Sequence, residues 1–134
     1  MALILAGSPL KAVGDFESSM DLLSTELFDK YKFKELFCAG HPEGNKDIDI
    51  QGTDQNLMSA LKWKANFFNR TDIKWSLTTQ FCFDIAPIKA WEKRLLEEGV
   101  KVPLNVGVAG PAKLQTMIKY AIMCGVGPSI RVLE

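Results

Sequence analysis

Two segments place polar side chains at the ends of apolar runs, where α/β proteins collect the groups that bind ligands. The only histidine, His41, follows an apolar run in CAGHPEGNKDID. Gln80 lies inside the apolar run LTTQFCFD, and its amide could pair with a heterocycle edge that presents both a donor and an acceptor. Simpler explanations stay open for both. The first segment is rich in turn formers, and a core amide satisfied by neighbouring backbone would explain the second.

Two further segments contain groups that could bind an anion. NVGVAGPAKLQ sets glycines before a predicted helix, but it lacks the phosphate-loop spacing, so close backbone packing is the favoured explanation. Lys62 and Lys64 could reach phosphate oxygens or could lie on a solvated helix face. The neighbouring Trp63, Phe67 and Phe68 are expected in the core. No nucleophile–base pair and no metal-ligand set is recognisable, so the sequence predicts no catalytic residue and no metal site.

The composition is that of one globular domain spanning residues 1–134, with 47% hydrophobic residues. Sixteen basic and sixteen acidic side chains balance, and no block of like charge is long enough to recruit nucleic acid or an anionic membrane. Cys38, Cys82 and Cys124 are far apart and set among apolar residues, so we expect reduced core thiols in a cytoplasmic protein. No apolar run approaches a signal peptide or a membrane span in length.

Apolar runs of strand length alternate with segments of helical spacing. The strands are predicted over four ranges: Ala2–Ala6, Glu35–Ala39, Leu77–Phe83 and Leu104–Val108. The helices are predicted over four others: Phe16–Phe28, Thr53–Phe68, Ile88–Glu98 and Ala112–Cys124. Residues typical of N-caps, first helical turns and helix ends occur near these limits, at Ser18, Thr53, Pro87, Pro111, Gly99 and Gly125.

Strand–helix alternation implies an α/β fold of parallel strands joined by right-handed crossovers. Two architectures satisfy this pattern, an open doubly wound sheet and part of a (β/α)8 TIM barrel, of which a chain of this length supplies roughly half. In both, the residues that follow each strand share one end of the sheet. We therefore expect four segments to surround one site: Gly7-Ser8, His41-Pro42-Glu43, Gln80–Asp84 and Gly107–Pro111.

Three motifs, in this order, resemble the methylenetetrahydrofolate reductase family: CAGHPEGN, TTQFCFD and VPLNVGVAGPAKLQTMIKYAIMCGVG. That family is a (β/α)8 barrel that binds FAD and passes hydride from NAD(P)H through the flavin to methylenetetrahydrofolate. The resemblance covers the barrel from about its fourth strand to just past its seventh. It implies a role in one-carbon folate metabolism.

The resemblance also implies four cofactor-binding residues. His41 falls where the family places an aromatic residue or histidine beside the flavin, and Asn45 falls where many members have a second histidine near the cofactor. Lys64 matches a basic position near the FAD phosphates. Ser8, in LAGS, stands where many members have the aspartate of an RGD motif, so an acceptor charge near the flavin is lost and flavin tuning should differ.

Two substrate-binding residues follow from the same resemblance. Gln80 matches the glutamine that hydrogen-bonds the pterin, and Tyr120 matches an aromatic residue that contacts the substrate or the nicotinamide. The glutamate that acts as general acid in the family belongs to earlier strands that this segment does not match. We therefore expect the isolated chain to be weakly active or inactive.

Two other interpretations stay open: a non-catalytic flavin- or folate-binding or assembly module built on half a barrel, and an unrelated small α/β domain. Half a barrel would expose the apolar residues of its interior and two unpaired strand edges. We expect such a chain to form homo-oligomers through its sheet or to be poorly soluble. A stable monomer would favour the small α/β domain.

Overall fold

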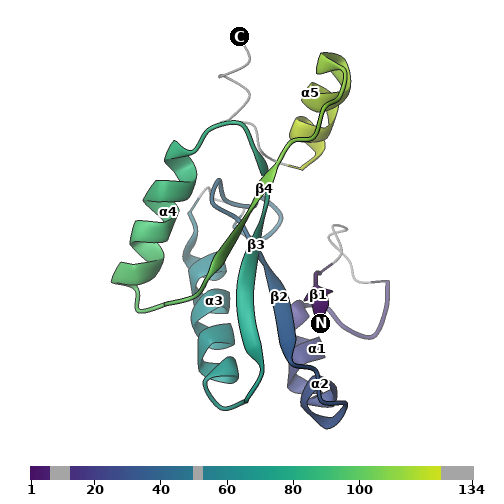
Figure 1. Ribbon diagram of the computed structural model, residues 1–134, viewed down its shortest axis with the longest axis vertical. Helices are drawn as coiled ribbons and strands as arrows, with labels where there is room; N and C mark the ends of the chain where they lie inside the picture. Colours follow the sequence, from purple (N-terminus) through teal and green to yellow (C-terminus); the bar gives the residue numbers. More distant parts are fainter. Residues whose placement is uncertain (7–12, 50–52, 125–134) are drawn as a thin grey trace.

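The fold is built on a parallel sheet whose strands follow one another in chain order. The computed structural model describes residues 1–6, 13–49 and 53–124. Within these residues the strands form one sheet of order β1-β2-β3-β4, and every neighbouring pair is parallel (Figure 1). The strands are β1 (Ala2–Ile4), β2 (Glu35–Gly40), β3 (Lys74–Cys82) and β4 (Leu104–Val108). The predicted α/β fold of parallel strands is confirmed.

Helices lie between these strands and after the last one. They are α1 (Ser19–Ser24), α2 (Leu27–Lys30), α3 (Gln55–Phe68), α4 (Ala86–Glu97) and α5 (Leu114–Met123). In the part of the chain that is described, no helix has both the length and the apolar character needed to span a membrane. The order of strands and helices is the alternation that the spacing of apolar residues predicts.

The limits of the strands depend on hydrogen-bonded pairing with neighbouring strands as well as on the apolar runs in the sequence. β4 has the predicted limits, whereas β1 ends at Ile4 instead of Ala6. β3 begins at Lys74 instead of Leu77 because Lys74 pairs with Glu35 of β2. That pairing satisfies the backbone of residues that precede the predicted apolar run.

The first predicted helix divides in two. Ser18 is an N-cap, as predicted, and it forms a capping box in which its hydroxyl accepts from the N–H of Asp21. The helix breaks at Glu26, whose φ of 56° is left-handed. Beside it, the Thr25 hydroxyl donates to the carbonyl of Leu22 at 2.7 Å and so competes with the helical backbone hydrogen bonds.

The start of α3 depends on an aspartate that the sequence analysis did not single out. The predicted N-cap, Thr53, is wrong, because the helix begins at Gln55. Its first N–H groups are satisfied by the buried Asp49 carboxylate, which accepts from the N–H of Asn56 and of Leu57, each at 3.1 Å. A capping residue this far from the helix in sequence leaves no capping-box signature.

Asp49→Ala should lower the free energy of unfolding by about 0.5–2 kcal/mol, because α3 loses the acceptor of two N–H groups at its N-terminus. Urea unfolding followed by circular dichroism measures this change. Asp47→Ala is the matched control, since Asp47 is exposed in the same loop and should change stability by less than about 0.5 kcal/mol. Equal losses in the two variants would contradict the capping role of Asp49.

The limits of the later helices are partly as predicted. Pro87 lies in the first turn of α4, and Gly99, with φ of 80°, follows its C-terminus. Pro111 was predicted in the first turn of the last helix, but α5 begins only at Leu114, so Pro111 lies in the preceding loop. Gly125, the predicted stop of that helix, lies outside the described residues.

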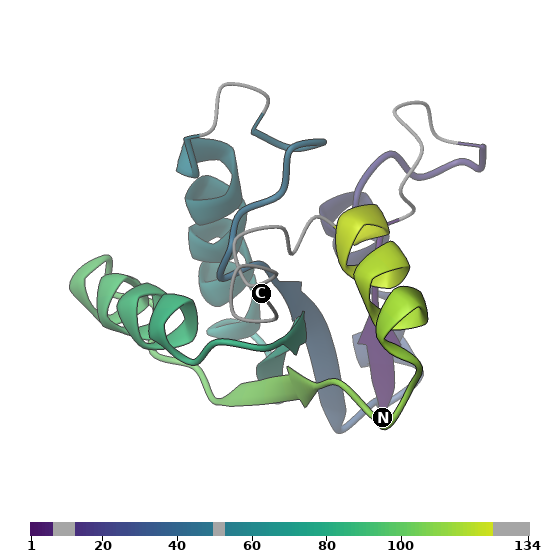
Figure 2. The ribbon, with the colours of Figure 1, turned by 90° about the horizontal axis from the view of Figure 1, so that it is seen from above.

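One core joins the sheet to α1, α3 and α4, which lie on the same face (Figure 2). Alternate residues of β2, Leu36 and Cys38, are fully buried, as period-two alternation requires. The helices supply Leu23, Met58, Leu61, Phe67, Phe68, Trp91 and Leu95 to this core. Phe67 and Phe68 are buried and Trp63 is half-buried against them, so their predicted core role is confirmed.

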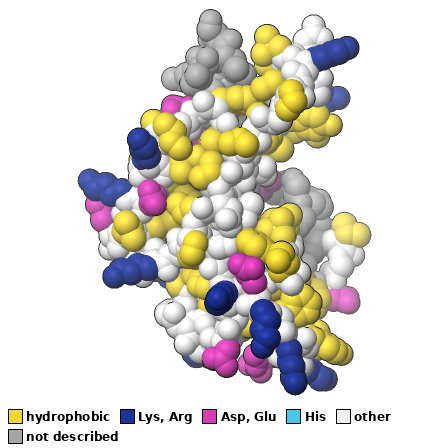
Figure 3. Space-filling view, in the orientation of Figure 1, with side chains coloured by type: hydrophobic (Ala, Val, Ile, Leu, Met, Phe, Trp, Pro, Cys, Tyr) yellow, Lys and Arg dark blue, Asp and Glu magenta, His cyan; other side chains and the backbone are white. Residues whose placement is uncertain are grey.

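The opposite face of the sheet carries no helix among the described residues (Figure 1). It mixes apolar with small polar side chains: Leu3 is 49% exposed, whereas the buried Ser76 hydroxyl accepts from the Asn105 amide at 2.8 Å. Figure 3 views this face, with apolar side chains over β4 and α5 and charged ones along α4 and toward the other end, where apolar ones also lie. α1, α3 and α4 therefore cover one side of the sheet, whereas α5 contributes no residue to this core.

Candidate functional site

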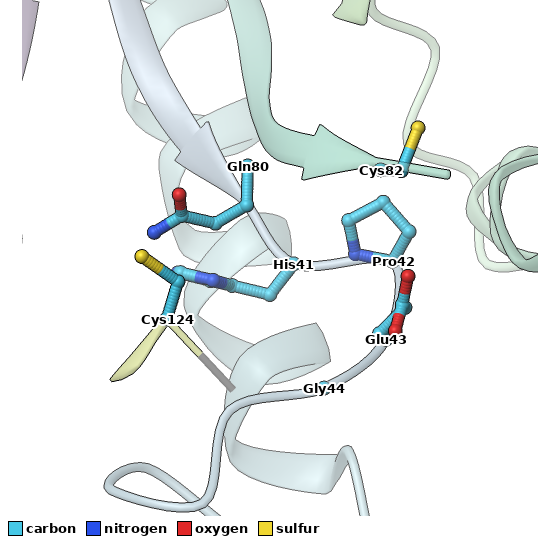
Figure 4. Close-up of a pocket in the computed structure, with 7 residues that line it drawn as sticks. All are labelled: His41, Pro42, Glu43, Gly44, Gln80, Cys82 and Cys124. Carbon is cyan, nitrogen blue, oxygen red and sulfur yellow. The ribbon is translucent and has the colours of Figure 1, made fainter. Parts of the chain in front are cut away.

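A small pocket opens at the carboxyl end of the sheet. His41, Pro42, Glu43 and Gly44 reach it from the loop after β2, Gln80 and Cys82 from the end of β3, and Cys124 from the end of α5 (Figure 4). Two of the four segments predicted to converge thus line one pocket. A third lies directly against it, since the N–H of Gly107 donates to the Thr79 hydroxyl at 2.9 Å.

An irregularity in β3 positions Gln80. The register between β3 and β4 shifts between Thr78 and Phe81, which is the signature of a β-bulge. The Thr79 hydroxyl closes the bulge by donating to the Gln80 carbonyl at 2.8 Å. The Gln80 side chain is exposed and makes no hydrogen bond with any described residue. The alternative of a satisfied core amide is therefore wrong, and this amide is free to bind a ligand.

His41 lies in a turn and also faces the pocket. Its carbonyl accepts from the N–H of Gly44 at 3.1 Å, so the predicted turn is present. Burial lowers the pKa of His41 below its ordinary value, and the positive charge of Lys64 lowers that pKa further. The imidazole is therefore neutral near pH 7, with one nitrogen that donates and one that accepts.

Lys64 is the one lysine in α3 that lies on the buried side of the helix, at 6% exposure. The solvated-face alternative is therefore wrong for Lys64 and correct for Lys62, which is exposed and pairs with Glu98. Burial lowers the pKa of the Lys64 ammonium and raises the pKa of the nearby Cys38 thiol. The spacing of Lys64 from Leu57 and Leu61 puts it on their side of the helix, and this spacing is a sequence signal that could have identified its burial.

Of the other predicted ligand-binding residues, Asn45, Lys64 and Tyr120 lie within the described residues and do not line this pocket. The Asn45 side chain accepts from the N–H of Asp47 at 2.9 Å and so stabilises the loop between β2 and α3. Tyr120 is 54% exposed on α5. Ser8 lies outside the described residues. The pocket thus brings together His41 and Gln80, with the positive charge of Lys64 behind His41.

The cysteines occupy three different environments, and all are free thiols. Cys38 is fully buried, which confirms its predicted core position. The same prediction is wrong for Cys82 and Cys124, which are half-buried and line the pocket. Burial raises the pKa of Cys82, and the negative charges of Glu43 and Asp84 raise it further. The apolar residues next to each cysteine in the sequence do not reveal these differences. The burial of each thiol depends on whether it lies in the core or in the pocket at the carboxyl end of the sheet.

A wider, open groove adjoins the pocket on the side of α3 and α4. Pro42, Glu43 and Gly44 line both hollows, and the groove continues over Thr53 and Pro87. An ion pair between Arg94 of α4 and Asp54 lies at its far side. A ligand longer than the pocket could therefore extend along the groove toward a paired charge.

No protein-family model matches this sequence. Among the described residues, no three histidine, cysteine or acidic side chains are grouped so that they could hold a metal ion. The pocket offers a neutral imidazole, an amide to which no described residue hydrogen-bonds, and two thiols. These groups suit a polar but uncharged ligand ring with donors and acceptors along its edge.

Proposed function

We propose that the chain is a segment of a (β/α)8 barrel resembling methylenetetrahydrofolate reductase, and that its pocket takes part in binding FAD and a folate substrate. The observation that carries the proposal is the free Gln80 amide beside the neutral His41 imidazole at the carboxyl end of a parallel sheet. A pterin edge presents a donor and an acceptor side by side, which an amide matches. The carboxyl ends of the strands are where barrel enzymes bind their substrates.

The winding of the sheet supports the barrel in preference to the open doubly wound sheet. The strands run in chain order, and α1, α3 and α4 contribute to a single core on one face. Doubly wound sheets reverse their strand order and carry helices on both faces. The uncovered face would then be part of the barrel interior, and we expect it to mediate self-association when the rest of the barrel is absent.

The cofactor supplies hydride transfer from NAD(P)H when it is bound, and the residues of this chain serve to orient ligands. His41 would lie beside the flavin and Gln80 would hold the pterin. Asn45, Lys64, Ser8 and Tyr120 enter the proposal through the family resemblance. Because the segment includes no general acid for opening the folate ring, binding without turnover is the expected behaviour of the isolated chain.

Titration calorimetry with FAD and with methyltetrahydrofolate tests the proposal. Both ligands should bind, and Gln80→Leu should weaken folate binding by about tenfold while FAD binding stays the same, because the pterin edge loses its partner. Gln55→Leu is the matched control, since Gln55 is exposed at the start of α3 and does not line the pocket. It should change neither affinity.

Three other outcomes have defined meanings. Binding of folate without FAD would replace the reductase segment with a folate-binding module. Failure of both ligands to bind the wild-type chain would overturn the proposal and favour an unrelated α/β domain. An equal loss of folate affinity in Gln80→Leu and Gln55→Leu would show that Gln80 does not bind the folate.

A further inference from the structure

A thiol, an imidazole and an amide face one another inside the pocket. Figure 4 shows the Cys124 sulfur next to the His41 ring and the Gln80 amide, with all three side chains turned toward the same space. They come from three elements: the C-cap of α5, the loop after β2 and the bulged end of β3. These residues are far apart in the sequence and line one pocket only in the folded chain.

Each group has the chemical character that thiol addition requires. The thiol is the nucleophile, and a neutral imidazole is able to accept its proton. Burial and the charge of Lys64 lower the pKa of His41, which keeps the imidazole in the neutral form that can accept a proton but also makes it a weaker base. The exposed Gln80 amide has N–H donors that no described residue uses, so they are available to an oxygen on which negative charge develops.

We propose that Cys124 is a nucleophilic thiol that adds to α,β-unsaturated carbonyl compounds, with His41 as proton acceptor and Gln80 as hydrogen-bond donor to the carbonyl oxygen. The Cys124 sulfur forms a bond to the β-carbon, and the electron pair of the C=C bond moves into an enolate. The thiol proton passes to His41 and then to the α-carbon. No oxidant or reductant is consumed, and the product is a neutral thioether.

Conjugate addition needs fewer groups than acyl transfer from an ester or amide. Attack of the thiol on an ester or amide would need a proton for the leaving group. A water molecule would then have to release the acyl group from the sulfur. Conjugate addition needs only one proton, which His41 takes from the sulfur and returns to the product. Apart from Glu43, the groups that line the pocket are uncharged, which suits the uncharged reacting end of an α,β-unsaturated carbonyl compound.

The other two cysteines provide internal controls. The Cys82 sulfur points away from His41 and Gln80 (Figure 4), and burial together with Glu43 and Asp84 raises its pKa. Cys38 is fully buried in the core. A reagent that responded to solvent access alone would modify Cys82 and Cys124 at similar rates, because both are half-buried.

The test is competitive labelling of the full chain with a limiting amount of N-ethylmaleimide, an α,β-unsaturated carbonyl compound, followed by peptide mass spectrometry. Cys124 should react at least about tenfold faster than Cys82, and Cys38 should remain unmodified. His41→Gln should slow the reaction of Cys124 by about tenfold or more. The rate at Cys82 in the same sample reports whether each variant is folded.

Gln80→Leu separates assistance to the carbonyl from simple access to the thiol. It should slow maleimide addition at Cys124 by about tenfold, because the enolate oxygen loses its donor. It should leave alkylation by iodoacetamide unchanged, since that displacement forms no enolate. Equal wild-type rates at Cys82 and Cys124 would overturn the proposal, as would an equal loss for both reagents in Gln80→Leu.

Discussion

Lys64→Met should raise the free energy of unfolding by about 1–3 kcal/mol near pH 7. The Lys64 side chain is 6% exposed, and it forms no ion pair or hydrogen bond with any residue in the described ranges. The neighbouring Cys38 thiol does not compensate its charge, because burial raises the pKa of that thiol. Folding must therefore remove part of the water around the ammonium or remove its proton, and methionine avoids both costs at similar side-chain length.

The stability gained by Lys64→Met should shrink as the pH rises. Burial lowers the pKa of Lys64 in the folded protein, whereas an unfolded lysine has a pKa of about 10.4. Between those two values the unfolded chain binds more protons, so a rising pH stabilises the wild-type protein through this group. Methionine does not titrate. Urea unfolding of both proteins at about pH 7 and pH 9 measures the difference.

Lys62→Met is the matched control for this prediction. Lys62 lies on the same helix, but it is exposed and pairs with Glu98, so its loss should change stability by less than about 0.5–1 kcal/mol. A Lys64→Met protein as destabilised as a core truncation would show that the ammonium has a stabilising partner, and it would contradict the prediction. A stability gain in Lys64→Met combined with weaker FAD binding would instead mark Lys64 as a residue kept for function.

Gly107→Ala should lower the free energy of unfolding by about 1–3 kcal/mol. A Cβ atom at this position would lie 2.8 Å from the Thr79 carbonyl oxygen and 2.9 Å from both carbonyl atoms of Gln80. These are backbone atoms of the bulge, so they cannot turn aside as the end of a long side chain would. The substitution should therefore separate β4 from β3 and also displace Gln80 from the pocket. Thermal and urea unfolding measure the loss of stability.

Gly110→Ala separates this contact from the general effect of replacing a glycine. A Cβ at Gly110 would meet no atom within 4 Å, so the variant should keep its stability or gain up to about 1 kcal/mol from a less flexible unfolded chain. If Gly107→Ala were as stable as Gly110→Ala, the close packing of the bulge against β4 would be disproved.

Local sequence patterns were sufficient for the elements whose causes are local. The limits of β4 follow from an apolar run between turn residues, and the cap at Ser18 follows from a hydroxyl and an acidic residue at capping-box spacing. The buried stripe of α3 follows from the repeat of Leu57, Leu61 and Phe68. Each of these signals lies within a single strand or helix and the residues beside it, so no distant partner is needed to interpret it.

The predictions failed where a distant residue supplies the partner. Lys74 joins β3 because Glu35 of another strand pairs with it, and α3 begins at Gln55 because the Asp49 carboxylate reaches its N–H groups. The break at Glu26 needs a left-handed backbone that propensity does not favour for a glutamate.

The candidate site shows the same difference between features with local causes and features with distant causes. The alternation of apolar runs and helical segments was enough to specify an α/β fold and to put His41 and Gln80 near strand ends, because period and polarity are properties of the chain itself. Three features came from packing alone: α1, α3 and α4 gathered on one face, the outward turn of Gln80 at the bulge, and the return of α5 that brings Cys124 to His41. They depend on contacts between elements remote in sequence, and no pattern within a single segment encodes those contacts.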